Sequence, residues 1–188
     1  KVTILASGAW KEMQRAKERG FTIVDVGTSV KNPWHIIRYL FNLYRALRKS
    51  EADVCLTFTI RPAIWGNIVT RYLGIPTVTN ITGIGPLFAS DDIAYRAARY
   101  LYQFSLVKVA KVFFQNHDDM NIFLKENITS SAVVERIPGS GIDCDYFAPR
   151  EKKNRDRKFR FLFIGRLLRD KGIIEYVNAA RMLKGELP

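Results

Sequence analysis

Short apolar runs alternate along the chain with stretches in which apolar residues recur at the spacing of a helix. The apolar runs predict strands at residues 2–5, 21–26, 54–58, 77–80, 112–115 and 133–137. Helical patterns separate these runs, at residues 11–19, 33–49, 63–73, 92–110 and 118–125. Strands that alternate with helices are typical of a parallel sheet covered by helices. We therefore expect an α/β fold with a Rossmann-like, doubly wound parallel sheet, in which the carboxyl ends of the strands share one edge.

The helix predicted from residue 33 carries two different stripes. Its apolar stripe is expected to face the core, and its basic stripe is expected to face solvent. The apolar stripe comprises Ile37, Leu40, Phe41, Tyr44 and Leu47, and the basic stripe comprises Arg38, Asn42, Arg45 and Lys49.

The pattern changes after the last of these strands. Residues 137–149 are rich in turn-forming residues, residues 150–158 are charged, and a buried strand followed by a helix is predicted from residue 159 onward. This change predicts a first domain at residues 1–149, a linker at 150–158 and the first strand and helix of a second Rossmann-like domain at 159–188. Because a lone strand–helix unit cannot bury both its faces, and Lys1 lies directly in a strand pattern, we expect the chain to be a fragment.

The turn between the last predicted strand and helix carries glycine and basic residues. Gly165 and Arg166 follow the apolar run, and Lys171 and Gly172 precede the helix. Backbone N–H groups at a helix start favour an anion, and two cations would strengthen its binding. The alternative interpretation is a solvated basic loop.

Two motifs, I-P-G-S-G-I-D-C-D-Y-F-A-P at 137–149 and G-R-L-L-R-D-K-G at 165–172, occur in order and at a suitable separation. Together they resemble the corresponding motifs of retaining GT-B glycosyltransferases of family 4 (group 1), and specifically the bacterial subgroup that acts on polysaccharides and lipid-linked saccharides. The resemblance implies a GT-B fold whose second domain has only begun here. It also implies that a first strand and helix of the first domain would precede Lys1. The fragment alone is then expected to be inactive.

The resemblance implies roles for individual residues. The loop T-F-T-I-R-P at 57–62 and the loop N-I-T-G-I-G at 80–85 resemble loops of the bacterial subgroup. Many members of the family have a histidine where this chain has Thr82, which puts the sugar preference of this chain in question. The expected catalytic residues are Arg166 and Lys171; the expected donor-binding residues are Gly165, Arg166, Lys171, Gly172, Thr82 and Gly83; and the expected acceptor-binding residues are Thr57, Thr59, Arg61, Asn80, Gly85 and Asn116. For the loops the alternative is a purely structural role, and His117 is a further, less favoured candidate for a general base.

The composition limits the partners and cofactors. The chain has 188 residues, a net charge of +12, two cysteines and two histidines, which favours an anionic partner and gives no zinc-ligand spacing and no disulfide framework. Asp143 and Asp145 spell D-x-D, but they lie inside the first of the two motifs, so we expect no metal and no other cofactor. No nucleic-acid-binding motif is present.

The expected activity is transfer of a sugar from a nucleoside-diphosphate-sugar, with a UDP-sugar favoured, to a polyprenyl-linked saccharide in cell-surface polysaccharide synthesis, with retention of configuration. The expected location is cytoplasmic, at the inner face of the plasma membrane. Two basic clusters are candidates for contact with anionic lipid. The alternatives are a sugar-nucleotide epimerase of the same fold and a non-catalytic sugar-binding or nucleic-acid-binding fragment. The first of the two basic clusters that are candidates for lipid contact comprises Arg38, Arg45, Arg48 and Lys49, and the second comprises Arg96, Arg99 and Lys108.

Overall fold

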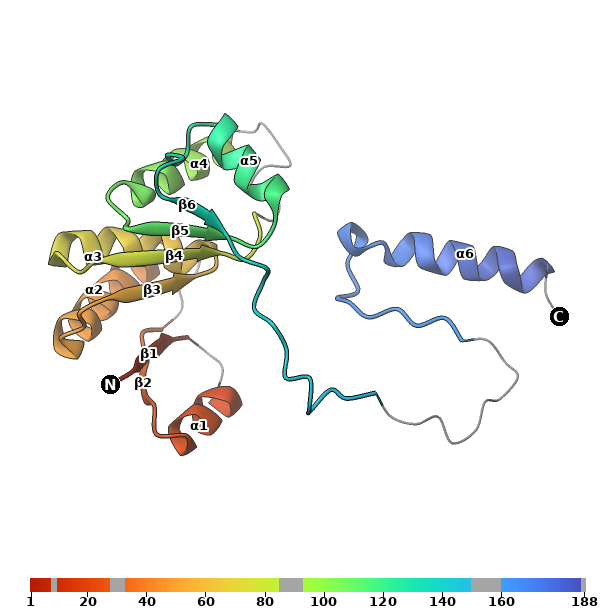
Figure 1. Cartoon of the computed structure of the whole chain (residues 1–188), viewed down its shortest axis with the longest axis horizontal. Helices are drawn as coiled ribbons and strands as arrows, with labels where there is room; N and C mark the ends of the chain where they lie inside the picture. The colour runs from red at the N-terminus through yellow and green to blue at the C-terminus, as the bar shows by residue number, and fades with distance from the viewer. Residues whose placement is uncertain (8–9, 28–32, 85–92, 150–159, 187–188) are drawn as a thin grey trace. The chain divides into compact units, whose positions relative to one another are not determined.

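The computed structural model describes residues 1–7, 10–27, 33–84, 93–149 and 160–186 (Figure 1). The chain divides into two compact units, Lys1–Gly141 and Ile142–Pro188, and each is described by itself. The predicted linker at 150–158 lies outside the described residues.

The first unit contains alternating strands and helices, close to the predicted ranges. Its elements are β1 (Thr3–Ala6), α1 (Trp10–Glu18), β2 (Thr22–Asp25), α2 (Pro33–Ser50), β3 (Cys55–Phe58), the π-helix η1 (Pro62–Gly66), α3 (Asn67–Leu73), β4 (Thr77–Ile81), α4 (Ile93–Leu106), β5 (Lys111–Phe114), α5 (His117–Lys125) and β6 (Val134–Arg136). The second unit contains the 3-10 helix η3 (Arg169–Lys171) and α6 (Ile173–Glu186).

The strands of the first unit pair in parallel, which confirms the predicted class of fold. They form two sheets, one of order β1-β2 and one of order β3-β4-β5-β6. The sequence predicted one continuous sheet, whereas the described residues form two. In the described residues β1 pairs only with β2 and β3 pairs only with β4, so no hydrogen-bonded ladder joins the two sheets.

The order β3-β4-β5-β6 follows the chain, so right-handed crossovers place α3, α4 and α5 on the same face of this sheet. That face holds the main core. Its fully buried members include Ile81 in β4, Phe114 in β5, Tyr102 in α4 and Phe123 in α5. The rings of Phe114 and Phe123 meet edge to face, with centroids 5.1 Å apart. The opposite face of β3 is open, because Leu56 and Phe58 are 59% and 49% exposed.

Helix α2 packs with α3 and the first sheet around a second core, and it does so with part of the stripe that the sequence predicted. Its buried residues are Tyr39, Leu43 and Leu47, whereas Ile37 and Phe41 are both 57% exposed. The prediction of a core-facing stripe is therefore wrong for Ile37 and Phe41, and right for Leu47, which is buried, and for Leu40 and Tyr44, which are partly buried against the core. Tyr39 and Leu43 are buried beside these residues, so the core-facing side of α2 is shifted toward them and away from Ile37 and Phe41.

The second unit lacks the predicted buried strand. Residues 160–164 form no strand, and Phe161, Leu162 and Ile164 are 66%, 78% and 86% exposed. A parallel strand needs neighbours for its hydrogen bonds, and the described part of this unit contains no other strand. The segment is instead held to α6 by Tyr176, whose hydroxyl donates to the carbonyl of Phe161 at 3.1 Å and whose ring lies 5.4 Å from that of Phe163.

Candidate functional site

The carboxyl ends of β3 to β6 share one edge of the larger sheet. The register pairs Phe58 with Asn80, and Phe114 with both Ile81 and Arg136. The loops that follow these strands therefore start side by side, as predicted. At this edge Gln115, which was not among the predicted site residues, donates from Nε2 to the hydroxyl of Ser140 at 3.2 Å. The sequence predicted that Gln115 leaves a strand at this edge, without a role for it.

The loop after β3 has unusual backbone geometry. Thr59 has a φ of 67°, although it is β-branched, and its carbonyl accepts a hydrogen bond from Ala63 N at 3.0 Å. Arg61 is the N-cap residue of the π-helix η1, and both Thr59 and Arg61 have exposed side chains. Positive φ at such a residue costs free energy, and π-helical turns often occur at functional sites. The loop thus holds a hydroxyl and a guanidinium outward on a strained turn.

The positive charge of Arg61 also influences Tyr39 of helix α2. Burial raises the pKa of Tyr39, and the positive charge of Arg61 partly opposes that rise. Tyr39 belongs to α2, so the electrostatic interaction places the loop after β3 near α2.

The predicted acceptor contact of Thr57 is not supported by its position. Thr57 is 4% exposed; its hydroxyl donates to Asn67 Oδ1 at 3.0 Å and lies 3.0 Å from the hydroxyl of Thr79. This hydroxyl is used inside the core, so it cannot also contact an acceptor unless these bonds break. Thr57 is a structural residue beneath the loop.

Asn80 lies on β4 beside Phe58, at the same edge. Its Oδ1 atom is buried and has no hydrogen-bond partner among the described residues. A buried polar atom without a partner costs free energy in the folded state, and such atoms are rare in native proteins. Asn80 Oδ1 therefore has an unused capacity to accept a hydrogen bond, but a ligand would reach it only after the residues that cover it move.

The loop after β4 presents Thr82 and Gly83. The Thr82 side chain is exposed, and Gly83 has a φ of 152° with no atom within 4 Å of the place where a Cβ would stand. Glycine is needed here for its backbone conformation rather than for space. Gly85 lies outside the described residues.

Asn116 begins helix α5. Its Oδ1 accepts a hydrogen bond from Asp119 N at 2.8 Å, and its Nδ2 donates to Asp119 Oδ2 at 3.0 Å. The side chain is thus an N-cap, which accounts for an asparagine at this position without a ligand. His117, the first residue of α5, has an exposed side chain.

Four of the predicted donor-binding residues belong to the second unit and lie on the turn before α6. They are Gly165, Arg166, Lys171 and Gly172. Arg166 and Lys171 are exposed, and the carbonyls of Arg166 and Leu168 accept hydrogen bonds from Leu168 N and Lys171 N at 2.8 and 3.0 Å. Gly172 has a φ of 77°, and its carbonyl accepts from Tyr176 N at 3.0 Å in the first turn of α6. A Cβ on Gly165 would lie 3.3 Å from the ring of Phe163. The turn thus brings two cations to the start of a helix, whose dipole also favours an anion.

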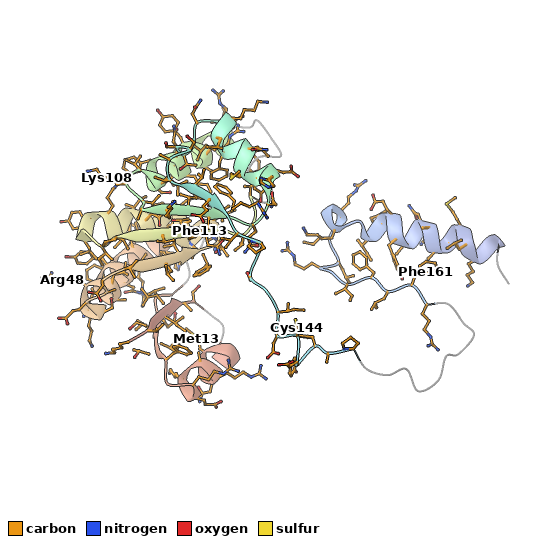
Figure 2. All side chains as sticks on the ribbon, viewed as in Figure 1. Met13, Arg48, Lys108, Phe113, Cys144 and Phe161 are labelled. Atoms are coloured by element: carbon orange, nitrogen blue, oxygen red, sulfur yellow. The ribbon has the colours of Figure 1, made fainter. Side chains whose placement is uncertain are left out.

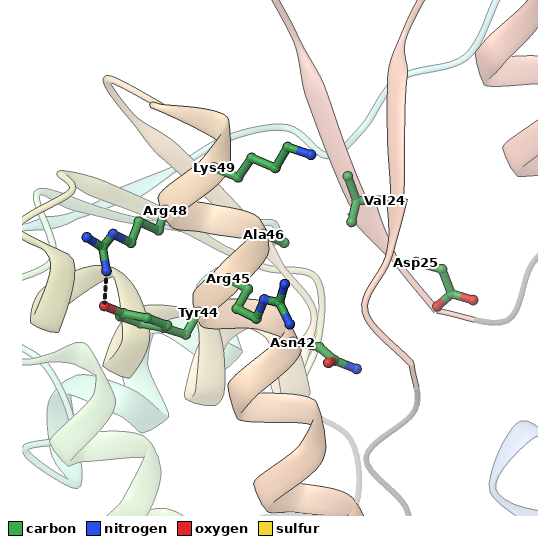
Figure 3. Close-up of a pocket in the computed structure, with 8 residues that line it drawn as sticks. All are labelled: Val24, Asp25, Asn42, Tyr44, Arg45, Ala46, Arg48 and Lys49. Atoms are coloured by element: carbon green, nitrogen blue, oxygen red, sulfur yellow. Dashed lines mark hydrogen bonds between the residues drawn. The ribbon is translucent and has the colours of Figure 1, made fainter.

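A pocket of about 720 Å³ lies between β2 and α2 of the first unit (Figure 3). Arg45, Arg48 and Lys49 of α2 and Asp25 of β2 contribute to its wall. Arg48 donates from Nη1 to the hydroxyl of Tyr44 at 3.3 Å. The pocket contains none of the residues predicted from the motifs.

No group of three or more metal-ligating side chains gathers within the described ranges. Asp143 uses Oδ1 to accept hydrogen bonds from Asp145 N at 3.0 Å and Tyr146 N at 2.9 Å, which stabilises a turn. Cys55 and Cys144 are free. None of the helices in the described residues combines the length and hydropathy that crossing a bilayer requires.

The chain is a distant homologue of two bacterial enzymes. It is 26% identical over 160 residues to a UDP-Gal:alpha-D-GlcNAc-diphosphoundecaprenol alpha-1,3-galactosyltransferase of Escherichia coli, over 78% of this chain and 40% of that enzyme. It is 28% identical over 192 residues to the N,N'-diacetylbacillosaminyl-diphospho-undecaprenol alpha-1,3-N-acetylgalactosaminyltransferase of Campylobacter jejuni, over 92% of this chain and 46% of that enzyme. The chain therefore spans less than half the length of these curated relatives.

The second of these matches covers so much of the chain that it includes residues of both compact units. Among solved structures, the chain is similar to Acinetobacter baumannii MurG, with a TM-score of 0.48 and 16% identity over 76% of this chain and 37% of that one. No family model matches the chain.

Proposed function

We propose, taking the distant homology to bacterial α-1,3-glycosyltransferases as the premise, that this chain is part of a glycosyltransferase of GT-B type. The enzyme would move a sugar from a nucleoside-diphosphate-sugar, with a UDP-sugar favoured, to a polyprenyl-diphosphate-linked saccharide. The observation that carries the proposal is that both relatives act on diphosphoundecaprenol-linked acceptors and form α-1,3 linkages. Retention of configuration follows if the donor is α-linked.

The first unit would bind the acceptor at the carboxyl edge of β3 and β4. Arg61 supplies a positive charge suited to an acceptor phosphate, and Asn80 supplies an oxygen without a partner that a sugar hydroxyl would reach once the residues covering it move. Thr59 holds its side chain outward on the strained turn just before Arg61. Thr82 and Gly83, on the adjoining loop, would approach the donor sugar.

The second unit would bind the donor diphosphate at the turn before α6. The chemical barrier lies in breaking the bond between the sugar and the diphosphate while negative charge develops on the phosphate oxygens. Fixed positive charges lower such a barrier, and Arg166 and Lys171 supply two of them. In this arrangement the cations take the place that a metal ion would have, so we expect transfer without added metal.

The test uses a full-length protein that contains this chain. It is incubated with UDP-, GDP- and TDP-sugars, a polyprenyl-diphosphate-saccharide and a chelator, while nucleotide release and product mass are followed together. We expect transfer, and we expect Arg166→Ala and Lys171→Ala each to lower its rate by about 100-fold or more. Arg181→Ala, an exposed arginine on α6, is the matched control and should retain the rate.

Two results would contradict the proposal. Conversion of the sugar nucleotide without transfer would assign the chain to a sugar-nucleotide epimerase of related fold. If the folded full-length protein is saturated with a sugar nucleotide and neither converts nor transfers it, the protein is a non-catalytic binding protein.

A further inference from the structure

Helix α4 carries apolar residues on two opposite sides. One side belongs to the main core, where Tyr102 and Leu106 are buried. On the other side Ile93, Tyr100 and Phe104 are 85%, 76% and 51% exposed. A helix at the surface of a globular protein normally has one apolar side, which faces the core. A second apolar side on the same helix therefore marks a contact surface.

The exposed apolar residues of α4 have the spacing of a coiled-coil seam. Their steps along the chain are four, three, four and three residues, which places about one side chain per turn on a narrow line. The small side chain of Ala97 lies between two larger ones, and it leaves room for a side chain of a facing helix. We call this row the α4 seam, and its exposed members are Ile93, Ala97, Tyr100 and Phe104 in the helix and Val107 in the turn directly after it.

The residues that flank the α4 seam are basic. Arg96 precedes Ala97, Lys108 follows Val107, and both cations are exposed. Figure 2 shows Lys108 at the outer surface of the first unit. Residues 93–110 include no aspartate or glutamate. Because flanking charges select the partner in a pair of packed helices, the seam suits a helix that carries carboxylates beside its own apolar row.

Arg71 of the neighbouring helix α3 adds a cation that is held in place beside the seam. Its Nη1 donates to the carbonyls of Phe104 at 2.9 Å and Val107 at 3.5 Å. Its guanidinium lies over the ring of Phe104, 4.2 Å from the centroid. These contacts fix the plane of the guanidinium, and a fixed guanidinium matches the planar carboxylate of a protein side chain. Arginine and tyrosine are also the residue types that most often dominate the binding energy of protein interfaces.

We propose that the α4 seam binds one amphipathic helix of a partner protein, a helix with apolar residues at the same spacing and with aspartate or glutamate beside them. The 14 residues of α4 span about 21 Å, which corresponds to about four turns of the partner. This surface is distinct from the proposed sugar transfer and does not depend on it.

The shape and charge of the seam favour this occupant over two others. A helix that lies in a bilayer buries a broad apolar face, whereas the α4 seam is one residue wide. Arg99, which the sequence grouped with Arg96 and Lys108 as a lipid contact, is half-buried and lies off the seam. A second copy of the chain would place the same cations against each other, which disfavours pairing of two α4 helices.

The test measures the binding of two fluorescein-labelled peptides to the 188-residue chain by fluorescence anisotropy. Both peptides are three heptads long, with leucine at the first and fourth positions of each heptad. The acidic peptide has glutamate at the positions that flank the leucines, and the basic peptide has lysine there. We expect the chain to bind the acidic peptide and not the basic one. Arg96→Glu/Lys108→Glu should reverse this preference and change the ratio of the two affinities by about 100-fold or more.

Two variants test the apolar part of the seam. Ala97→Gln fills the gap in the row with a residue that favours helix, and it should weaken binding of the acidic peptide by about 10-fold or more. Tyr100→Ala/Phe104→Ala should weaken binding by a similar factor, because less apolar area is buried. The matched control is Ile37→Ala/Phe41→Ala, which removes exposed apolar side chains from α2 and should bind the acidic peptide as the wild type does. Circular dichroism checks that each variant keeps its helix content.

Three results would overturn the proposal. The first is equal binding of the two peptides by the wild-type chain, or binding of neither. The second is co-sedimentation with phosphatidylglycerol vesicles that Arg96→Glu/Lys108→Glu abolishes while neither peptide binds, which would assign the seam to lipid. The third is a dimer in sedimentation velocity that Ala97→Gln dissociates, which would assign the seam to a second copy. None of these measurements involves sugar transfer, so their failure is distinct from failure of the proposed activity.

Discussion

Asn67 in α3 donates a hydrogen bond of 2.9 Å from Nδ2 to the hydroxyl of Thr79 in β4. Both residues are buried, with exposed fractions of 2% for Asn67 and 0% for Thr79. The Oδ1 atom of Asn67 accepts from Thr57 in β3. One buried amide therefore ties a helix to two neighbouring strands, directly below the loops that form the proposed acceptor edge.

Replacing Asn67 by alanine should destabilise the chain by about 2–4 kcal/mol, because two buried hydroxyls lose a partner. Urea denaturation followed by circular dichroism measures this change. Thr82→Ala removes an exposed hydroxyl from the same edge and should stay within about 0.5 kcal/mol of the wild type. A similarly small effect of Asn67→Ala would show that the network contributes little.

Replacing Tyr102 by phenylalanine should stabilise the chain by about 1 kcal/mol. The hydroxyl of Tyr102 is buried and has no hydrogen-bond partner among the described residues, so its removal ends a desolvation cost. Calorimetry should show a higher Tm. Tyr146→Phe, at an 81% exposed side chain, should leave the Tm unchanged. A lower Tm for Tyr102→Phe would indicate that the hydroxyl has a partner after all.

The same tyrosine predicts a loss of stability in alkali. Burial raises the pKa of Tyr102 in the folded chain, whereas in the unfolded chain it titrates near 10. Above about pH 10 the unfolded state loses the proton first, so the free energy of unfolding falls as the pH rises. Denaturation between pH 9 and 11 measures this slope, and Tyr102→Phe should make it shallower. An equal slope in the variant would assign it to Cys55 and Tyr39, whose pKa values burial also raises.

Replacing Thr59 by glycine should stabilise the chain by about 1 kcal/mol, because glycine adopts a positive φ without strain. Thr59→Ala is the matched control, since alanine keeps the strain and loses only the hydroxyl. Urea denaturation distinguishes the two variants. Equal stabilities for glycine and alanine would argue that the φ of 67° carries no cost.

Replacing Asn80 by leucine separates a structural role from a ligand-binding role. Removing a buried oxygen that lacks a partner among the described residues should leave stability equal or higher. In a full-length enzyme the acceptor hydroxyl would lose its partner, so the KM for the acceptor should rise by about 10-fold or more. Lower stability with unchanged kinetics would show that Asn80 serves the fold alone.

The sequence predicted the elements of the first unit well, because apolar runs and helical spacing reflect burial directly. It also predicted which loops share an edge, since that follows from parallel pairing. It could not predict which side chains at that edge are free to meet a ligand. Thr57 and Thr59 are two residues apart in one motif, yet the first is buried in a hydrogen-bond network and the second is exposed on a strained turn.

Two other expectations failed because they depend on neighbours that local sequence does not specify. Ile37 and Phe41 matched the core stripe that includes Leu47, but the structure leaves both exposed and buries Tyr39 and Leu43 instead. The apolar run at 160–164 matched a buried strand, but its hydrogen bonds require other strands beside it. Asn116 illustrates the reverse case, because the sequence N-H-D-D already contains the helix cap that the structure shows.

The open side of β3 has a consequence for how the chain behaves in solution. Its backbone groups facing away from β4 form no ladder within the described residues, and Leu56 and Phe58 lie uncovered beside them. An unpaired strand with apolar side chains is a template on which a second copy can add its own strand. The net charge of +12 keeps copies apart by repulsion, and dissolved salt screens that repulsion. Raising the ionic strength should therefore lower the protein concentration above which copies of the chain associate.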